Sequence, residues 1–411
     1  MDFMIEKELK EIVGKGAFGK DCNLVSFKLH DYMIGEEEWS YRRIFCDVTT
    51  SDGSHHNIMI KLKLKEYELR KCFESDLIFH NELILYEKII PFLFECRGPT
   101  VNDDNVFFVP RYFYGRNNCS ELMPNDLIVI ENVCILGYYL SNEIVFLDND
   151  HVTVALRTIA KSHGLSYTAK HKEPGKFHDI MAGIKNTLFA GNGHWMAQNG
   201  LLKKCGRRGV ERLLERNGNR YRDHPHLRLL NELFDDAENT LIQTMAAREP
   251  LSVICHCDYH RDTLMFQYDE CGRPFDALTI DFFMLHYGSP ALDLSSFLYM
   301  STTQRMRETH WHDFMDTYCA TLAASVPPGV HVPGRAEIDA EMAATAIYGL
   351  ARASFCLPFM LRVRSDELDS LAMSDDPVDY FLALGGDLAT ECLADIVQHL
   401  VDMGYTNVQS N

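Results

Sequence analysis

The sequence predicts an α+β fold of two lobes, in which a small, antiparallel, β-rich lobe precedes a larger and mostly helical lobe. Three observations predict it. Strand-like segments with turn signals fill most of the first hundred residues, and helical periodicity dominates beyond about residue 150. A short β island then interrupts the helices near residues 251–280. A chain of 411 residues is long enough for two such units. We place the lobes at residues 1–132 and 133–411.

The N-terminal lobe is predicted from strands and one helix. The strand candidates are Leu24–Leu29, Arg43–Thr49, Asn57–Leu64 and Leu127–Ile130. The second and third flank an Asp52-Gly53 turn, which favours a hairpin. A helical stripe follows at Phe79, Leu83, Tyr86 and Ile90. Pro91 is expected to end this helix, because proline removes a backbone donor.

The C-terminal lobe is predicted from helices around one hairpin. Residues 152–163, 225–247 and 337–356 have helical periodicity, and the last helix is expected to end before Pro358. Leu251–Cys255 is an apolar strand candidate. The hairpin consists of Leu264–Tyr268 and Phe275–Ile280, joined by the turn at residues 269–274.

Composition excludes several classes of protein. The formal net charge is −19, and this argues against nucleic-acid binding, which needs clustered cations, and against a polybasic membrane-surface role. The chain has 13 cysteines without regular small-domain spacing, which favours reduced thiols. The start has no signal-peptide pattern, and no apolar run reaches about 18 residues. We therefore expect an acidic cytoplasmic enzyme that acts as a monomer, with no nucleic-acid or membrane partner.

A glycine motif lies near the N-terminus, with Gly14, Gly16 and Gly19 in the segment GKGAFGK. A dinucleotide fingerprint would need a strand before it and a helix after it. A P-loop would need Ser or Thr where Asp21 stands. A glycine-rich flap between two strands would cover nucleotide phosphates with backbone N–H groups. The strand predicted at residues 24–29 favours the flap, and an ordinary flexible turn stays open.

A lysine and a glutamate form the second candidate constellation. Lys61 ends the apolar strand segment Ile58-Met59-Ile60, and Glu82 lies on the following helix. A strand lysine paired with a helix glutamate is the arrangement that grips nucleotide phosphates in kinase-type sites. The alternative is two solvated surface charges, and Lys63 is interpreted as a solvent-facing lysine of the same strand.

Two aspartates flank the predicted hairpin. Asp258 precedes it in the segment Cys255-His256-Cys257-Asp258, and Asp281 follows it. Because a two-stranded return brings its ends together, both carboxylates are expected at one rim. One would accept a proton from a hydroxyl, and the other would hold Mg²⁺ on a nucleotide. A zinc site is the rival interpretation, but no second ligand pair is evident.

Three further features have mainly structural interpretations. Asp293 is expected to cap or brace the helix after the GSPALDLS turn, and His163 is expected to be a satisfied core histidine. The basic stretch at residues 203–222 is expected to be a solvated helix face, with attraction of an anionic ligand as the alternative.

Several of these segments together resemble one known family. They are Phe79-His80-Asn81-Glu82, Glu131-Asn132 with Gly137-Tyr138, His256-Cys257-Asp258, Met265–Asp269, and Asp281-Phe282 with Tyr287–Ser295. The chain resembles the ecdysteroid kinase-like family over residues 10–400, with residues 256–269 and 280–295 as the most specific parts. That family is related to choline kinase and aminoglycoside phosphotransferases.

The resemblance implies a two-lobed protein-kinase-like fold and phosphorylation of a small-molecule hydroxyl with ATP and Mg²⁺. The implied substrate is an ecdysteroid or another steroid or xenobiotic alcohol. Residues 1–132 would be the nucleotide-binding lobe and 133–411 the catalytic and substrate-binding lobe. Lys61 would bind phosphates and Glu82 would orient it, while Asp258 would be the catalytic base and Asp281 the magnesium ligand. Backbone groups of the residues Ile130, Glu131 and Val133 would meet adenine.

The chain departs from the family pattern at three positions. Cys257 replaces the usual glycine of H-G-D, Asn132 stands where aspartate is usual, and Thr263 stands where an asparagine helps to hold metal. Thr263 is taken as the second metal candidate, although a hydroxyl is a poorer ligand than an amide oxygen. The alternative function is a catalytically weak, pseudokinase-like protein that binds a small molecule. A protein kinase is disfavoured because no A-P-E segment follows Asp281.

Overall fold

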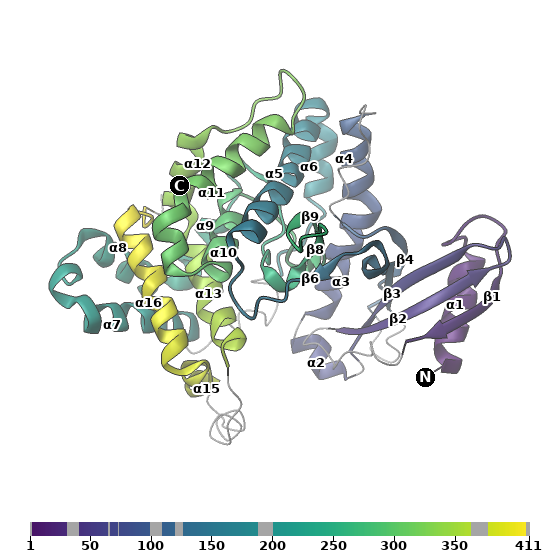
Figure 1. The fold of residues 1–411 in the computed structure, drawn as a ribbon, viewed down its shortest axis with the longest axis horizontal. Coiled ribbons are helices and arrows are strands. Elements are labelled where there is room, and N and C mark those ends of the chain that lie inside the picture. The colour runs from purple at the N-terminus through teal and green to yellow at the C-terminus, as the bar shows by residue number, and fades with distance from the viewer. Residues whose placement is uncertain are drawn as a thin grey trace.

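The fold is a two-lobed one, with a β-rich lobe beside a larger helical lobe (Figure 1). The computed structural model describes residues 2–30, 41–64, 66–72, 74–98, 109–119, 126–187, 200–362 and 377–407. The strands are β1 (Leu24–Leu29), β2 (Tyr41–Thr50), β3 (His55–Lys63), β4 (Tyr112–Arg116), β5 (Leu127–Glu131), β6 (Tyr139–Leu140), β7 (Val253–Cys255), β8 (Leu264–Tyr268), β9 (Pro274–Thr279) and β10 (His286–Gly288).

Helices dominate beyond residue 149, as predicted, but residues 225–247 and 337–356, each predicted as one helix, form two helices apiece. In the first lobe they are α1 (Asp2–Gly14), α2 (Tyr67–Cys72), α3 (Ser75–Ile84), the π-helix η2 (Leu85–Ile89) and α4 (Ile90–Arg97). From there on they are η4 (Val133–Leu136), α5 (Asn149–Lys172), α6 (Pro174–Met181), α7 (Leu201–Tyr221), α8 (Pro225–Asp235), α9 (Ala237–Met245), η7 (Arg261–Thr263), η8 (Phe282–Met284), α10 (Ala291–Ser301), α11 (Gln304–Ala324), α12 (Arg335–Thr345), α13 (Ile347–Met360), α15 (Pro377–Ala383) and α16 (Gly386–Met403).

A five-stranded antiparallel sheet in the order β1-β2-β3-β5-β4 forms the centre of the first lobe. Side chains alternate between its two faces, as in any strand. One face packs on α1 through residues such as Ile58 and Ile60. The other face carries Met59 and Ile130 and packs on α3, α4 and the second lobe. Lys61 has the same parity as Met59, so it lies on the face toward the second lobe.

The helix after β3 does not end at Pro91, so that prediction was wrong. α3, η2 and α4 follow one another without a gap from Ser75 to Arg97. The N–H of Ile90 bonds the carbonyl of Leu85, five residues back. Pro91 then lies in the first turn of α4, directly after the π-helical turn of η2.

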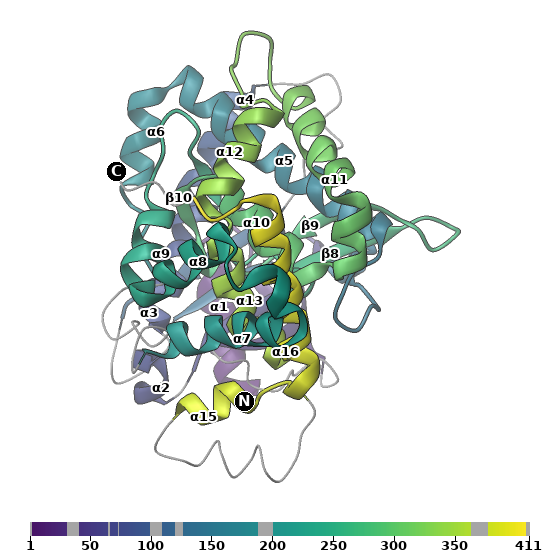
Figure 2. The same ribbon diagram turned by 90° about the vertical axis from the view of Figure 1, so that its left-hand side faces the viewer.

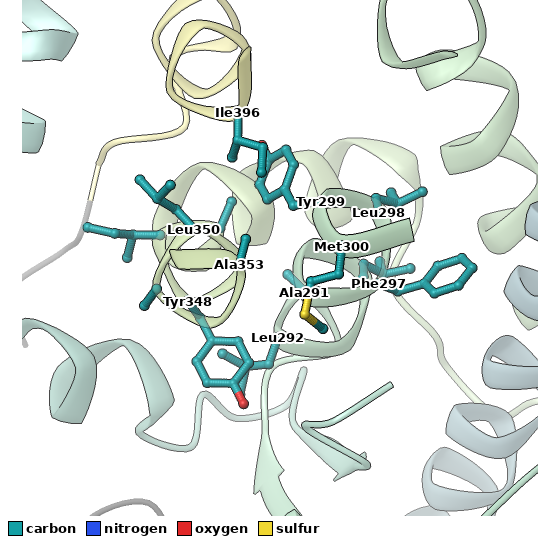
Figure 3. Packing of buried hydrophobic residues seen from close by; sticks show 14 of the residues in the cluster. Ala291, Leu292, Phe297, Leu298, Tyr299, Met300, Tyr348, Leu350, Ala353 and Ile396 are labelled. Atoms are coloured by element: carbon teal, nitrogen blue, oxygen red, sulfur yellow. The ribbon is translucent and has the colours of Figure 1, made fainter. Parts of the chain in front are cut away.

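Apolar helices fill the second lobe. Every residue of α10 is buried, and α10 packs on α13 in the centre of the lobe (Figure 3). Contrary to expectation, α13 passes through Pro358, but only two residues of the helix follow that proline. In the described part of the chain no single helix is long and apolar enough to span a membrane; α12 and α13 together reach the required length and composition but bend by 58°.

The predicted basic stretch lies on α7, beside α16 (Figure 2). Its arginines meet acidic residues of α16: Arg212 pairs with Glu391 at 2.6 Å, and Arg216 pairs with Asp395 at 2.8 Å. These contacts hold two helices together. They leave no support for the alternative that this stretch attracts an anionic ligand.

Candidate active site

A buried ion-pair cluster lies where the sheet of the first lobe faces the second lobe. Lys61 Nζ on β3 is 2.5 Å from Glu82 Oε1 on α3 and 2.5 Å from Asp281 Oδ1. The Tyr41 hydroxyl donates to the same Asp281 oxygen at 2.6 Å. The predicted pairing of Lys61 with Glu82 is therefore present in the structure, and Lys61 itself is fully buried.

The charges of this cluster do not cancel. One ammonium faces two carboxylates. Burial opposes the charge on Lys61, but Asp281 and Glu82 hold the pKa of Lys61 above its usual value. Burial raises the pKa of Glu82. Burial works in the same direction on Asp281, yet Lys61 and Tyr41 keep the pKa of that carboxyl low. Mg²⁺ prefers the oxygen atoms of ionised carboxylates as ligands. Asp281 is ionised and the cluster has more carboxylates than cations, so these residues fit the metal implied by the resemblance.

The loop that carries Asp258 is fixed by hydrogen bonds. His256 Nε2 donates to the carbonyl of Ile280 at 2.9 Å, and His256 Nδ1 accepts the N–H of Asp258 at 3.2 Å. Burial lowers the pKa of His256, which suits a neutral ring with one donor and one acceptor nitrogen. The bond to Ile280 ties the Asp258 loop to the residue before Asp281, so the two aspartates lie at one rim as expected.

Asp293 braces this loop by accepting two of its backbone N–H groups. Its two carboxylate oxygens accept the N–H groups of His256 at 2.8 Å and Cys257 at 2.7 Å. His163 bonds Asp293 at 3.2 Å and Tyr318 at 2.8 Å. The core role predicted for His163 is confirmed, and His163 and Asp293 form one network. Asp293 braces the loop, but the prediction that it caps the following helix was wrong, because α10 already begins at Ala291 and has no side-chain cap. The Cys255 thiol lies in the same cluster, where it donates to the Ser289 carbonyl at 3.3 Å.

Asp258 has an ion-pair partner that the sequence did not reveal. Arg352 on α13 contacts Asp258 Oδ1 through Nη2, and both side chains are buried. His260 Nε2 is 3.6 Å from the same oxygen. Burial would raise the pKa of Asp258, but the Arg352 guanidinium and His260 bring it well below its usual range. The carboxylate is thus held ionised and ready to accept a proton.

Two residues of the site have left-handed backbone. Cys257 has φ 60° and Asp281 has φ 66°. Glycine adopts this conformation without strain, which explains physically why the family has glycine where this chain has Cys257. The cysteine is held there because its N–H and carbonyl both have buried partners, Asp293 and the Tyr348 hydroxyl.

The Thr263 hydroxyl forms its hydrogen bonds within the loop that carries Asp258. Its hydroxyl lies 2.9 Å from the Asp258 carbonyl and 3.0 Å from the His260 carbonyl, and it accepts the N–H of His260 at 3.1 Å. The side chain is buried. The predicted role of Thr263 as a metal ligand stays a prediction, and these contacts favour bracing of the Asp258 segment instead.

The strand β5 and the turn after it form the back of the interlobe site. Ile130 is buried between β3 and β4, and the N–H of Glu131 bonds the Arg111 carbonyl at 2.8 Å. Val133 packs with four apolar residues, three of which come from the β8–β9 hairpin and its end: Tyr138, Met265, Leu278 and Ile280. An apolar surface of this kind suits a flat aromatic base.

The glycine motif does not lie between two strands, so that expectation was wrong. Helix α1 runs to Gly14, and a turn containing Gly16 and Gly19 follows before β1. Phe18 within the motif packs on the sheet face that carries Ile58 and Ile60, which is opposite to Lys61. Gly14, Gly16 and Gly19 are therefore separated from Lys61 by the sheet. The strand-turn-strand position is occupied by the β1–β2 connection, and its residues 31–40 lie outside the described residues.

A family model decides which proteins this chain belongs with. The model of the ecdysteroid kinase-like family matches residues 42–327. The chain belongs to the ecdysteroid kinase-like family. This membership makes it a small-molecule kinase of the protein-kinase-like fold. No curated protein matches the chain.

Solved structures with a related chain trace are distant from this member of the ecdysteroid kinase-like family. A macrolide 2'-phosphotransferase of type I has 12% identity and a TM-score of 0.39, with 93% of this chain and 96% of that chain covered. An ethanolamine kinase from Plasmodium vivax has 12% identity and a TM-score of 0.40, with 88% and 80% covered. A macrolide 2'-phosphotransferase from Brachybacterium faecium has 16% identity and a TM-score of 0.36, with 84% and 91% covered.

Sequence reasoning missed two side chains of the candidate site. Arg352 lies 94 residues from Asp258, and Tyr41 lies 240 residues from Asp281. Neither has a motif around it. The only sequence signal for Arg352 is a lone cation within an otherwise apolar helix, in the segment YGLARASFCL. A buried arginine needs a partner, so such a residue can be flagged in advance even though its partner cannot.

Proposed function

We propose that this protein transfers the γ-phosphoryl group of ATP to a hydroxyl of a small molecule, a steroid or xenobiotic alcohol. The observation that carries the proposal is the Lys61–Glu82–Asp281 cluster beside a rigid loop that presents Asp258. Phosphoryl transfer requires mainly positioning and charge neutralisation, and these groups can supply both. The steroid or xenobiotic acceptor follows from family membership.

The residues have separable roles in this proposal. Bound Mg²⁺-ATP would supply the phosphoryl group and neutralise the charge that develops on it. Lys61 would hold the phosphates, with Glu82 keeping the ammonium in place, and Asp281 would hold the metal. The acceptor hydroxyl would give its proton to Asp258 Oδ2 or Oδ1. The apolar surface of Val133, Met265 and Ile280 would support adenine.

A transfer assay tests this function. The purified protein is incubated with ATP, Mg²⁺ and a panel of ecdysteroids, other sterols and plant-glycoside alcohols. We expect one or more acceptors to gain a single phosphoryl group by mass spectrometry, with stoichiometric ADP. ATP binding without transfer to any alcohol in the panel would contradict the enzymatic proposal.

A catalytically weak binding protein is the second candidate, and two observations favour it. The Thr263 hydroxyl is engaged within the loop. Asp258 is already paired with Arg352, so an acceptor hydroxyl must share or displace that contact. Both side chains already have partners within the protein, which leaves Thr263 less available to hold a metal and Asp258 less available to accept a proton.

The variant Thr263→Asn separates the two candidates. An asparagine amide oxygen is a better metal ligand than a threonine hydroxyl. If wild type is a weak binding protein, the variant should gain ATP turnover of about tenfold or more, because an added metal contact that stabilises the transition state by about 1.4 kcal/mol raises the rate tenfold. If wild type is already a competent kinase, Thr263→Asn should bring no gain, and loss of the loop bonds should lower its melting temperature.

Arg352 should determine how far kcat/KM is maintained toward acidic pH. Arg352 keeps the pKa of Asp258 low, so the base stays deprotonated in mildly acidic buffer. In Arg352→Met that pull is gone and burial raises the pKa, so the acid limb of the kcat/KM profile should move upward by at least about one pH unit. Arg352→Lys keeps the charge and should leave the limb close to that of wild type. An unmoved limb in Arg352→Met would show that Asp258 does not titrate as the base.

A further inference from the structure

A cavity separate from the kinase site lies between the α10–α11 junction and α16. Its volume is about 230 Å³. Apolar side chains form much of its wall: Phe146, Tyr299, Leu357 and Ile396. Tyr299 of α10 and Ile396 of α16 lie next to each other in Figure 3. Lys61, Asp258 and Asp281 are not among the lining residues, so any ligand here would bind apart from the phosphoryl-transfer centre.

Arg307 on α11 lines this cavity and a neighbouring one of about 220 Å³. Its side chain is 3% exposed. Nη1 donates to the Thr302 carbonyl at 2.5 Å, but Nε has no hydrogen-bond partner. Within the described part of the chain, no carboxylate lies at ion-pair distance from Arg307. A buried guanidinium without a counterion is costly.

The start of α11 adds positive potential at the same place. This helix of 21 residues begins at Gln304, and both Gln304 and Arg305 line the cavity. Thr303 caps the N–H of Met306 at 3.3 Å. A helix N-terminus directs partial positive charge toward a bound anion.

One acidic residue limits how much negative charge the cavity accepts. Asp395 lines both cavities, but it is bound to Arg216 at 2.8 Å. Arg305 also lines the cavity but is exposed to solvent, so the buried charge left to neutralise is the one on Arg307. A monoanion would neutralise it, whereas a phosphate dianion would add a surplus negative charge near Asp395.

We propose that this cavity binds a small organic carboxylate whose body is apolar. The carboxylate would accept hydrogen bonds from Arg307 and the first turn of α11, and the body would pack on Phe146, Leu357 and Ile396. This site is independent of the proposed kinase function. The cavity is of a size to hold a single-ring or short-chain acid.

Binding of matched acids and amides tests the proposal. Benzoate, phenylacetate and hexanoate are titrated into the full-length protein by calorimetry, beside benzamide, phenylacetamide and hexanamide. At least one acid should bind about tenfold or more tightly than its amide, since a hydrogen bond to a charged group is worth about that factor. Arg307→Met should abolish this preference. Arg228→Met is the matched control, because the side chain of Arg228 on α8 is largely exposed and lines neither cavity; it should weaken binding by less than about threefold.

Cys392 provides a readout that needs no variant. Its thiol lines the cavity and is a free, partly buried cysteine. Iodoacetamide labelling of Cys392, followed by mass spectrometry, should slow severalfold with a bound acid and stay unchanged with its amide. Equal binding of acids and amides, an unaffected Arg307→Met variant, or failure of all three acids to bind and to protect Cys392 would each overturn the proposal.

Discussion

Asp258→Asn should lower kcat by about 10²- to 10⁴-fold, the usual contribution of a positioned proton acceptor. The amide cannot take the proton of the acceptor hydroxyl, but it has nearly the same shape. ATP binding should stay within about threefold of wild type, because the groups proposed to hold the nucleotide and its metal, Lys61, Glu82 and Asp281, are unchanged. Steady-state kinetics and equilibrium binding of a nucleotide analogue measure the two effects separately.

The neighbouring carboxylate of Asp262 provides the control for this substitution. Its side chain is about half exposed and lies beside His260 and Arg261. Asp262→Asn should change kcat by less than about threefold, as expected for an exposed charge. Because Asp258→Asn also leaves the Arg352 guanidinium without its ion-pair partner, rates are compared per folded molecule. An Asp258→Asn protein that keeps more than about a tenth of wild-type kcat would contradict the base assignment.

Lys61→Met should both destabilise the fold and remove nucleotide binding. The substitution leaves Glu82 and Asp281 buried without a cation, and breaking a buried pair in this way costs about 3–5 kcal/mol. It also removes the ammonium that would meet the ATP phosphates. Denaturant unfolding should show the loss of stability, and calorimetry with ATP and Mg²⁺ should show no binding to the protein that remains folded.

Lys63→Met separates these two effects. Lys63 was interpreted as solvent-facing, but it is fully buried on the same strand and pairs with Asp76 and with Asp126, the latter at 2.9 Å. Its loss should destabilise the protein by a similar amount. Its partners do not belong to the Lys61 cluster, so ATP binding per folded molecule should persist. Equal loss of ATP binding in both variants would mean that Lys61 acts only through stability.

The lobes are joined by a shared core as well as by ions. Ile254 and Phe282 of the second lobe pack with Phe79 and Ile130 of the first. Asn81 on α3 donates to the carbonyls of Lys185 at 2.8 Å and Phe283 at 3.3 Å. These contacts hold the helix of Glu82 against the segment of Asp281. The position of the Lys61–Glu82–Asp281 cluster is thereby fixed by packing around it.

The sequence by itself determined four of the five strands of the first sheet, the hairpin and the four charged residues of the site. Each of these has a local signal. Alternation and turn residues mark β2 and β3, and short motifs surround Lys61, Glu82, Asp258 and Asp281. Such signals span only a few neighbouring residues, so they can be recognised in the sequence without knowledge of the fold.

Only the tertiary structure decided which groups meet across the chain. The glycine motif was misplaced because α1 carries it to the far face of the sheet, and a glycine pattern does not say which face it occupies. Lys63 proved buried because Asp76 and Asp126 come to it from other elements. Arg352 reached Asp258, and Arg307 was left without an acid, through helix packing. The physical reason is common to the three charged residues: the cost of burying a charge is local, but the partner that offsets it is chosen by packing between distant segments.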